Sequence, residues 1–383
     1  VFRYMMIENK VINHIKRYGP VSYEEFMQLC LYEFKDSYYR KQDPVGFHGD
    51  FYTSPFLHPI FGSLIAIKLF SMWDSLERPG VFDVVELGAG NGKLSRDILD
   101  YSKHISKDFY DAIRYFCVDV REVSFNNSYE HISKIEVINI DRLFGFSIQG
   151  CILSNEFFDA LPVSRICREE NELFEVKVAW SITGLHEVYI PVGEKVLKQI
   201  KNWGIEIPEG YTVEIGTVFE SIIEGIASVL HKGFVLTIDY GGLSEDLYGV
   251  PSRKHGTIRS FKNNVQVSNV LGVPGTQDIT SHVNFSMLMQ KGLEVGLKLE
   301  EFTLQRTFML NLGCGWMLDK LEKSSLERSI YVLNKRRIES LLDESGLGGF
   351  RVMVQSKGAF MNKDLLIVDI LNRLKVPILN KAV

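Results

Sequence analysis

The chain has 383 residues, of which 45% are hydrophobic, and a formal net charge of −5 at pH 7. This length allows a large hydrophobic core, and the weak negative charge argues against general affinity for nucleic acid or for anionic membranes. The five cysteines are odd in number and have no CxxC spacing, which indicates reduced thiols and gives no sign of a zinc or other metal site.

The first 78 residues are expected to form a helical extension. Residues 4–17 place apolar side chains at helical spacing, and Ser22 followed by Glu25 is typical of a capping box at the start of a second helix. The N-terminus resembles neither a secretory nor a transit peptide, and no apolar run reaches the ~18 residues of a membrane span. We therefore expect a cytoplasmic bacterial protein, or a mitochondrial matrix protein if the chain is eukaryotic and processed.

A long loop is expected at residues 36–59, which are rich in Gly, Pro, Tyr and His. Loops of this length inside compact proteins are usually functional, so we expect a lid over a ligand. Its segment GDFYTSP offers a cofactor the small polar side chains of Asp50, Thr53 and Ser54. An ordinary turn or helix start at Ser54 is the alternative.

The segment VFDVVELGAGNGKL, residues 81–94, is the most informative of the chain. An apolar run ends in Glu86 and a helical pattern follows, as in the first βα unit of an open parallel sheet. Between them lie three glycines, Gly88, Gly90 and Gly92, spaced GxGxG rather than the GxGxxG of nicotinamide-binding turns. We interpret this turn as binding the amino-acid end of S-adenosylmethionine (SAM), with Glu86 near its ammonium group. A dinucleotide site and a turn that binds nothing are the alternatives.

The next predicted strand, residues 115–120, ends with Asp119. In doubly wound sheets an acidic residue at this place binds the ribose hydroxyls, and a helix cap or a surface carboxylate is the alternative. Further strands that complete a mostly parallel sheet are expected over residues 136–140, 151–154 and 233–240.

The predicted strand over residues 151–154 leads into the segment SNEFFDALP. Open α/β sheets bind ligands at the carboxyl ends of their strands, so Asn155, Glu156 and Asp159 are expected near the methyl donor. Two carboxylates at i and i+3 match the donors of a guanidinium and would orient it for attack. We therefore predict Glu156 and Asp159 as catalytic residues and Asn155 as a cofactor ligand. The alternatives are a helix cap at Asp159 and a Glu156 that binds the cofactor or supports the fold.

Four further polar residues end or follow predicted strands and loops: Asp239 and Tyr240 in TIDYGG, and Gln277 and Asp278 in GTQDIT. We expect them to bind the substrate, with ordinary turn residues as the alternative for each. Residues 172–179 and 185–191 alternate in polarity and predict an antiparallel hairpin. The predicted domains are an extension over residues 1–78, a core over 79–358 with an insertion at about 164–212 and a long loop at about 241–283, and a tail over 359–383.

In this order the motifs GDFYTSP, ELGAGNGKL, SNEFFDALPV, DYG and GTQDIT resemble the MidA-like family of SAM-dependent methyltransferases, over about residues 19–358. The resemblance implies an α/β fold of class I, with a Rossmann-like, mostly parallel sheet, an N-terminal helical extension and an inserted β-hairpin and helical region. It also implies SAM as the cofactor and a protein substrate. For a mitochondrial member it implies methylation of an arginine in a subunit of respiratory complex I, in the assembly of that complex.

Position by position, Glu86 and the three glycines match the SAM loop of the family. Ala89 replaces the usual proline, a mild change, and Asp119 stands where relatives often have glutamate. Ser164 replaces a histidine that relatives often carry, so no role is carried over to that side chain. Glu156 is also similar in position to the first glutamate of the substrate-clamping loop of arginine methyltransferases, with Asp159 in place of the second.

We thus expect an enzyme that transfers a methyl group from SAM to a protein side chain, with arginine as the favoured acceptor. Arginine stays protonated because of its high pKa, so the carboxylates align it rather than deprotonate it before attack. Two alternatives stay open. One is a nicotinamide oxidoreductase, which the glycine spacing disfavours. The other is a SAM-binding assembly factor or chaperone with little turnover, in which the long loops and aromatic residues bind a partner.

Overall fold

The computed structural model describes residues 2–40, 53–121, 123, 125, 129–263, 265–362, 371 and 374–380. The chain divides into two compact units, each assembled from separate stretches of sequence. Unit 1 comprises Val1–Phe51, Phe157–Glu224 and Gly241–Lys291, and unit 2 comprises Tyr52–Glu156, Gly225–Tyr240 and Gly292–Val383.

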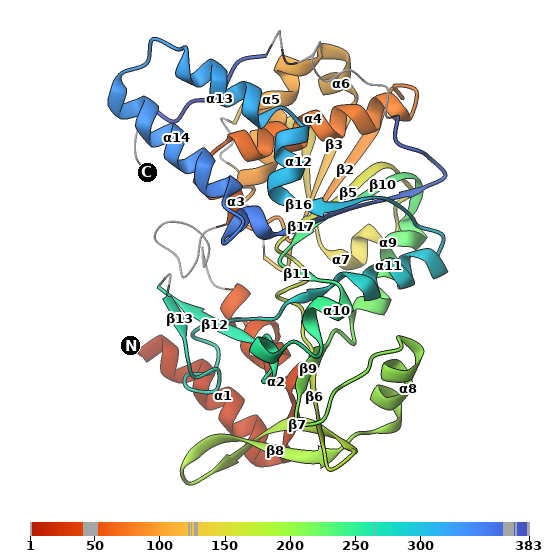
Figure 1. Ribbon diagram of the computed structural model, residues 1–383, viewed down its shortest axis with the longest axis vertical. Helices are drawn as coiled ribbons and strands as arrows, with labels where there is room; N and C mark the ends of the chain where they lie inside the picture. Colours follow the sequence, from red (N-terminus) through yellow and green to blue (C-terminus); the bar gives the residue numbers. More distant parts are fainter. Residues whose placement is uncertain are drawn as a thin grey trace. The chain divides into compact units, whose positions relative to one another are not determined.

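Unit 2 is built on a seven-stranded sheet with the strand order β16-β17-β10-β5-β2-β3-β4 (Figure 1). Its strands are β2 (Phe82–Leu87), β3 (Ile113–Val118), β4 (Ile135–Ile138), β5 (Ile148–Asn155), β10 (Leu230–Asp239), β16 (Lys298–Leu304) and β17 (Arg351–Lys357). All pairs from β10 to β4 are parallel, and β17 is antiparallel to both of its neighbours. The strand order reverses between β2 and β5, and open α/β sheets bind their ligands at such a switch point.

The helices of unit 2 are α3 (Ser54–Leu57), α4 (Ile60–Ser75), α5 (Lys93–Ile105), α6 (Lys107–Ala112), α7 (Ile140–Leu143), α12 (Gln305–Asn311), α13 (Cys314–Glu322) and α14 (Arg328–Leu342), with 3-10 turns η3 (Ile132–Lys134) and η5 (Leu347–Gly349). One apolar core joins α4, α5, α12, α13 and α14 to the sheet. α4 is buried on nearly every side because its sequence offers almost no polar face. Its buried Lys68 is neutralised by the carboxylate of Glu301, at 2.7 Å from Nζ.

Unit 1 holds a five-stranded antiparallel sheet of β1 (Val21–Ser22), β6 (Ser164–Glu169), β7 (Glu172–Ser181), β8 (Gly184–Pro191) and β9 (Thr212–Ile215). Its helices and turns are α1 (Phe2–Tyr18), α2 (Tyr23–Gln28), η1 (Leu29–Glu33), η2 (Tyr38–Arg40), α8 (Glu194–Asn202), α10 (Ser244–Leu247) and η4 (Pro251–Arg253). An apolar core joins α1 and α2 to β7. Two further helices, α9 (Phe219–Val229) and α11 (Phe285–Glu294), have residues in both units.

Several local predictions are confirmed. β7 and β8 form the expected antiparallel hairpin. The backbone N–H of Glu25 donates to the Ser22 hydroxyl at 3.1 Å, as expected for the cap of α2. The open, mostly parallel sheet of unit 2 is also as predicted.

The segment expected as a long loop at about 241–283 is corrected. It contains β11 (Gly241–Gly242), β12 (Arg259–Lys262), β13 (Val265–Val267), β14 (Asp278–Thr280) and the start of β15 (Val283–Asn284). β12 pairs with β13 and β14, and β11 pairs with β15. These strands have two to four residues each, too few for an alternating pattern to stand out in the sequence.

No helix in the described part of the chain is both long enough and apolar enough to cross a membrane.

Candidate active site

Glu86 lies near the end of the central strand β2, with its side chain on the face of the sheet that packs against the helices of the apolar core. The residue is 4% exposed, and its Oε2 accepts a hydrogen bond of 2.8 Å from the hydroxyl of Tyr115 on β3. Burial raises the pKa of Glu86 to about 8, against the lowering effect of the Tyr115 hydrogen bond. A buried carboxyl group with a raised pKa gains most from a cationic ligand, which would restore its ionised form.

The glycine turn leads from β2 into α5. Gly88, Gly90 and Gly92 all have positive φ, of 71°, 60° and 72°, which side chains with a Cβ rarely adopt. Backbone N–H groups of the turn donate to the carbonyl of Val118 at the end of β3, at 2.9 Å from Gly88. The turn is therefore fixed between two strands, and the glycines are required by its conformation.

Asp119 follows β3 directly and contacts the same turn. Its Oδ2 accepts from the backbone N–H of Gly90 at 2.8 Å, and its Oδ1 accepts from the backbone N–H of Arg121 at 2.9 Å. The Nε of Arg121 lies 3.4 Å from the same Oδ1. A carboxylate has about four acceptor positions, so Asp119 is oriented by these bonds and can still accept from a ribose hydroxyl.

The space beside Gly90 fits a ligand that approaches the backbone. A Cβ at Gly90 would meet one described atom within 4 Å, the Nη2 of Arg121 at 3.7 Å, whereas a Cβ at Gly92 would lie 2.5 Å from the ring of Phe125. Gly92 is therefore needed for packing inside the protein, whereas at Gly90 the described residues leave space at the switch point of the sheet. Together with the carboxyl groups of Glu86 and Asp119, this space fits a ligand that has an ammonium group and vicinal hydroxyls, as SAM has.

Asn155 and Glu156 lie at the carboxyl end of β5, beside the end of β2 in the parallel ladder. Glu156 has a φ of 52°, an uncommon and strained conformation for a residue other than glycine. Its N–H donates to the carbonyl of Ile238 at 2.9 Å, and the Nδ2 of Asn155 donates to its Oε1 at 3.0 Å. The Oδ1 of Asn155 is buried and has no hydrogen-bond partner in the described part of the chain, so it can accept from a ligand.

The remaining predicted residues of unit 2 have contacts within the protein. Ser54 is fully buried and exchanges hydrogen bonds with Gln305 of α12, at 3.3 and 3.2 Å, and Thr53 precedes it at the N-cap of α3. Asp239 is fully buried, and its Oδ1 accepts from the N–H of Tyr240 at 3.0 Å. Ligand contacts of these four residues stay predictions. Asp50 lies outside the described residues.

In unit 1 the structure brings together two carboxylates that the sequence predicted separately, those of Asp159 and Asp278. The hydroxyl of Tyr39 donates to the Oδ1 of Asp278 at 2.7 Å. Burial raises the pKa of Tyr39 well above its ordinary value, and the charges of Asp278 and Asp159 raise it further. Gln277 lies apart from this group: its Nε2 donates to the carbonyl of Asn269 at 3.0 Å, so its amide stabilises a neighbouring turn.

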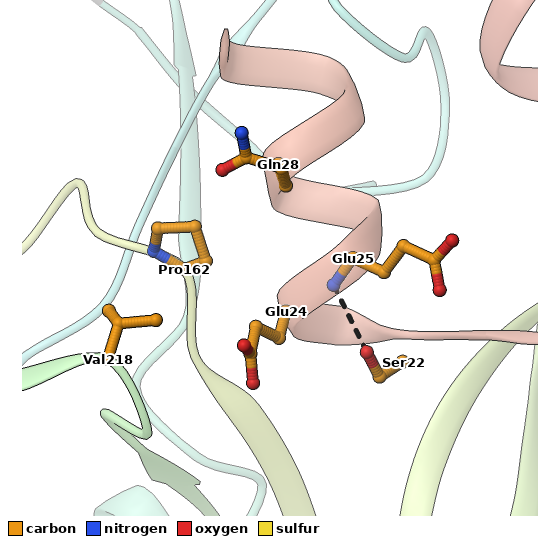
Figure 2. A pocket seen from close by; sticks show the side chains of 6 residues that line it. All are labelled: Ser22, Glu24, Glu25, Gln28, Pro162 and Val218. Carbon is orange, nitrogen blue, oxygen red and sulfur yellow. Dashed lines mark hydrogen bonds between the residues drawn. The ribbon is translucent and has the colours of Figure 1, made fainter. Parts of the chain in front are cut away.

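Unit 1 also has a cavity of about 410 Å³ that none of the predicted site residues lines (Figure 2). It is lined by Ser22, Glu24, Glu25, Gln28, Pro162 and Val218. Glu24 accepts from the hydroxyls of Thr217 at 2.5 Å and Ser164 at 3.5 Å, and Glu25 contacts the ring of His14 at 2.8 Å. The carboxylates of this cavity thus connect α2 to its neighbours. Ser164 takes part in this connection, and it is the residue that departs from the family pattern.

Three residues of these sites were missed in the sequence: Tyr115, Arg121 and Tyr39. Tyr115 shares a face of the sheet with Glu86 because Val84 is its partner in the parallel register. Side chains two residues apart share a face of a strand, so the predicted strand over residues 115–120 indicated the face on which Tyr115 lies. The pairing with β2 that brings Tyr115 to Glu86 could not be predicted from the local sequence. Tyr39 contacts a residue far along the chain, so nothing in the local sequence indicated its role.

Comparison with known proteins identifies the family. The model of a family described as "Putative S-adenosyl-L-methionine-dependent methyltransferase" matches residues 64–303, which is well over half of the chain. The protein arginine methyltransferase NDUFAF7, mitochondrial, of Xenopus laevis is 28% identical over 360 residues, covering 83% of this chain and 77% of the relative.

Two crystal structures of Burkholderia thailandensis proteins share the fold. The first, bound to S-adenosyl-homocysteine, has a TM-score of 0.80 at 22% identity and covers 94% of this chain and 93% of its own. The second, a native structure, has a TM-score of 0.81 at 23% identity and covers 99% and 96%. The chain therefore belongs to this family of SAM-dependent methyltransferases, which confirms the expected class I fold, the cofactor and the reaction class.

Proposed function

We propose that this chain transfers a methyl group from SAM to an arginine side chain of a protein. The observation that carries the proposal is Glu156, a carboxylate on strained backbone at the carboxyl end of β5. This strand is the parallel neighbour of β2, which leads into the glycine turn. The strain has a cost, and residues with such strain cluster at functional sites.

The residues of unit 2 would hold the cofactor, whose sulfonium supplies an electrophilic methyl group. In the proposal Glu86 accepts hydrogen bonds from the ammonium group, and the nearby positive charge lowers the raised pKa of this carboxyl group. Asp119, which the backbone of the turn already orients, accepts from the ribose hydroxyls. Gly90 lets the ligand approach the backbone, and the Oδ1 of Asn155 accepts one further hydrogen bond.

Glu156 and Asp159 would orient the acceptor. The two residues lie three positions apart in the segment that follows β5. A guanidinium has five N–H donors in a rigid fork, and carboxylates match it in both charge and geometry. Its pKa is too high for deprotonation before attack. As the new N–C bond forms, the bond from the methyl carbon to sulfur would break and S-adenosylhomocysteine would be the leaving group. The attacking nitrogen would release its proton to solvent, so the product stays cationic.

The relatives support a protein substrate. Those at 27–28% identity are named protein arginine methyltransferases and are mitochondrial proteins. We extend the arginine acceptor from them to this chain as part of the proposal. From the resemblance to the MidA-like family we add a subunit of respiratory complex I as the candidate partner.

A transfer assay tests the proposal. Purified protein is incubated with methyl-labelled SAM and with proteins of a lysate, and label on protein is counted. We expect labelling by the natural chain and a decrease of about 100-fold or more in Glu156→Gln, because a misplaced nucleophile costs rates of that order. Binding of S-adenosylhomocysteine, measured by calorimetry, should stay unchanged in this variant.

Glu170 provides a matched control. It is also a glutamate with positive φ, of 54°, but it lies between β6 and β7 in unit 1. Glu170→Gln should label protein as the natural chain does. If Glu156→Gln keeps its full labelling rate, Glu156 is not the acceptor-orienting group. If the natural chain binds SAM and labels nothing, the chain acts as a SAM-binding assembly factor instead.

A further inference from the structure

The strand β14 carries two polar side chains on one face. Side chains alternate between the faces of a strand, so Asp278 and Thr280 point to the same side and Ile279 to the other. Ile279 is fully buried in the apolar core of unit 1. The face that carries Asp278 and Thr280 is therefore the one turned away from this core.

The hydroxyl of Thr280 is buried, and none of the described residues is its hydrogen-bond partner. The residue is 3% exposed, and its Oγ1 makes no hydrogen bond to any residue that the structure describes. Buried hydroxyl groups nearly always have a partner, because losing the bond to water without replacement is unfavourable. An unsatisfied hydroxyl beside a carboxylate on the same face of a strand indicates that a ligand supplies the missing hydrogen bond.

Tyr39 fixes the carboxylate of Asp278 in place. Its hydroxyl donates to Oδ1 at 2.7 Å, and its ring stacks on the ring of Tyr32, with 5.5 Å between the centroids and 19° between the planes. The hydroxyl of Tyr32 in turn donates to the carbonyl of Ala160 at 2.8 Å. The two tyrosines therefore connect β14 to the segment that carries Asp159.

A second contact joins the same two segments. The backbone N–H of Ser281, which follows β14, donates to the carbonyl of Asp159 at 2.9 Å. Asp159 is 5% exposed and Asp278 is 2% exposed, and the charges of both act on Tyr39. Three oxygen-bearing side chains from two distant parts of the sequence, those of Asp159, Asp278 and Thr280, are thus held in one region of unit 1. We refer to these three residues as the acceptor cluster.

We infer that the acceptor cluster binds the guanidinium group of the methyl acceptor. Tyr39 is a positioning residue in this inference: it touches no substrate and acts by orienting the carboxylate of Asp278. The inference rests on the proposed arginine methylation, and it adds Thr280 and Tyr39 to the residues that determine the acceptor.

The chemistry of the cluster matches a guanidinium better than other groups. Two carboxylates supply the opposite charge, and the Thr280 hydroxyl adds one neutral acceptor. A guanidinium presents five donors in one plane, whereas an ammonium presents three. A urea group has nearly the same shape as a guanidinium but no charge. Selection for arginine over citrulline is therefore the signature of the cluster.

A binding experiment on the full chain tests the inference. In the presence of saturating S-adenosylhomocysteine, the protein is titrated with N-acetyl-arginine amide and with N-acetyl-citrulline amide. We expect at least tenfold stronger binding of the arginine probe. Tyr39→Phe and Thr280→Val should each weaken that binding about five- to tenfold, the usual effect of one lost hydrogen bond. Asp278→Asn, a second route to the same site, should reduce the preference for arginine over citrulline.

Two matched variants in unit 1 serve as controls. Tyr248→Phe removes a hydroxyl that donates to the carbonyl of Glu214 at 3.0 Å, and Thr276→Val removes one that donates to the carbonyl of Val273 at 3.0 Å. Both should bind the arginine probe as the natural chain does. A general structural defect would change the affinity for S-adenosylhomocysteine, which we expect to be unchanged in Tyr39→Phe and Thr280→Val. The melting temperature of Tyr39→Phe should fall moderately, because the buried carboxylate of Asp278 loses one hydrogen bond.

The outcomes separate the two proposals. Equal binding of both probes, or cluster variants that bind like the controls, would overturn the acceptor cluster even if the chain methylates arginine. Selective binding of the arginine probe that depends on Tyr39 and Thr280 would support the cluster. If that binding came without any methyl transfer, the proposed function would be wrong and the cluster would stand.

Discussion

At the scale of single residues, the fold has changed the pKa of one predicted site residue and the backbone conformation of another. Glu86 is a carboxyl group with a raised pKa on a central strand, and Glu156 is a glutamate on left-handed backbone. The sequence predicted both as site residues because each follows an apolar strand. The sequence could not predict the raised pKa of Glu86 or the positive φ of Glu156. The pKa depends on burial by distant segments and on a hydrogen bond from Tyr115.

The raised pKa of Glu86 makes stability depend on pH. The folded pKa of about 8 lies above the ordinary value of 4.5, so between these values the folded chain holds more protons than the unfolded chain. The contribution of Glu86 to stability is then fully present below about pH 4.5 and is lost as the pH rises through 8. Glu86→Gln removes the titration. We expect the variant to gain stability relative to the natural chain from pH 5 to pH 9, on the order of a few kcal/mol.

Urea unfolding of the ligand-free protein at pH 5, 7 and 9 measures this difference. Midpoints that shift in parallel for both chains would show that the Glu86 carboxyl titrates normally.

The strain at Glu156 predicts that a residue which relieves it raises the stability of the chain and removes its activity. Glycine adopts positive φ readily, so Glu156→Gly should relieve the strain and raise the free energy of unfolding by about 1 kcal/mol. The same change removes the carboxylate and should abolish methyl transfer. Glu170→Gly, at a φ of 54°, should stabilise the chain to a similar degree and keep its activity. Destabilisation by Glu156→Gly would contradict the idea that function maintains this strain.

At the scale of elements, the parallel strands were predictable and the short ones were not. β2, β3, β5 and β10 are apolar runs that end in polar or glycine residues, a pattern that local sequence carries. β14 has three residues, and within the described part of the chain it pairs with β12 alone. Asp278 was predicted as a substrate-binding residue with an ordinary turn residue as the alternative, and no role was predicted for Thr280. Their common face became visible only once the strand β14 was assigned.

β6, β8 and β9 of unit 1 are connected by a buried charged group. Arg165 on β6 is 7% exposed and lies between the carboxylates of Glu187 on β8 and Glu214 on β9, with its Nε at 3.2 Å from Glu214. Arg165→Met leaves the carboxylate of Glu214 buried without its cation. We expect a loss of roughly 3–5 kcal/mol in the free energy of unfolding.

Arg168 on the same strand provides the comparison. Its Nε lies 3.8 Å from Glu209, and the two side chains are 39% and 52% exposed, so Arg168→Met should cost less than about 1 kcal/mol. Denaturant unfolding measures both effects. Equal losses of unfolding free energy in the two variants would show that the buried ion pair stabilises the fold no more than the exposed one does.

At the scale of the whole molecule, the two units differ in how much the sequence reveals. The five parallel strands of unit 2 follow their order along the chain outward from one reversal between β2 and β5, so general rules for α/β proteins predict this part of the topology. The last strand, β17, is instead inserted between β10 and β16, antiparallel to both. Unit 1 is assembled from three separate stretches, and its contacts join residues that are far apart, such as Tyr39 and Asp278. The expected domain boundaries, drawn from changes in local pattern, stay a prediction.

The residues proposed to bind the cofactor were easier to predict from the sequence than those proposed to bind the acceptor. Glu86, the glycines, Asp119 and Asn155 all lie in unit 2 and came from motifs in the sequence. Asp159 and Asp278 lie in unit 1, and the roles proposed for Tyr39 and Thr280 emerged only from the structure. Recognition of the acceptor is therefore the part of the account that most needs a measurement.

That measurement is the chemical identity of the methylated residue. Lysate protein labelled by this chain and methyl-labelled SAM is digested and analysed by mass spectrometry, with Glu156→Gln as the comparison. The account predicts methylarginine as the labelled residue with the natural chain, and at least about 100-fold less with the variant. Label on lysine or another side chain, or equal amounts of methylarginine from both chains, would contradict it.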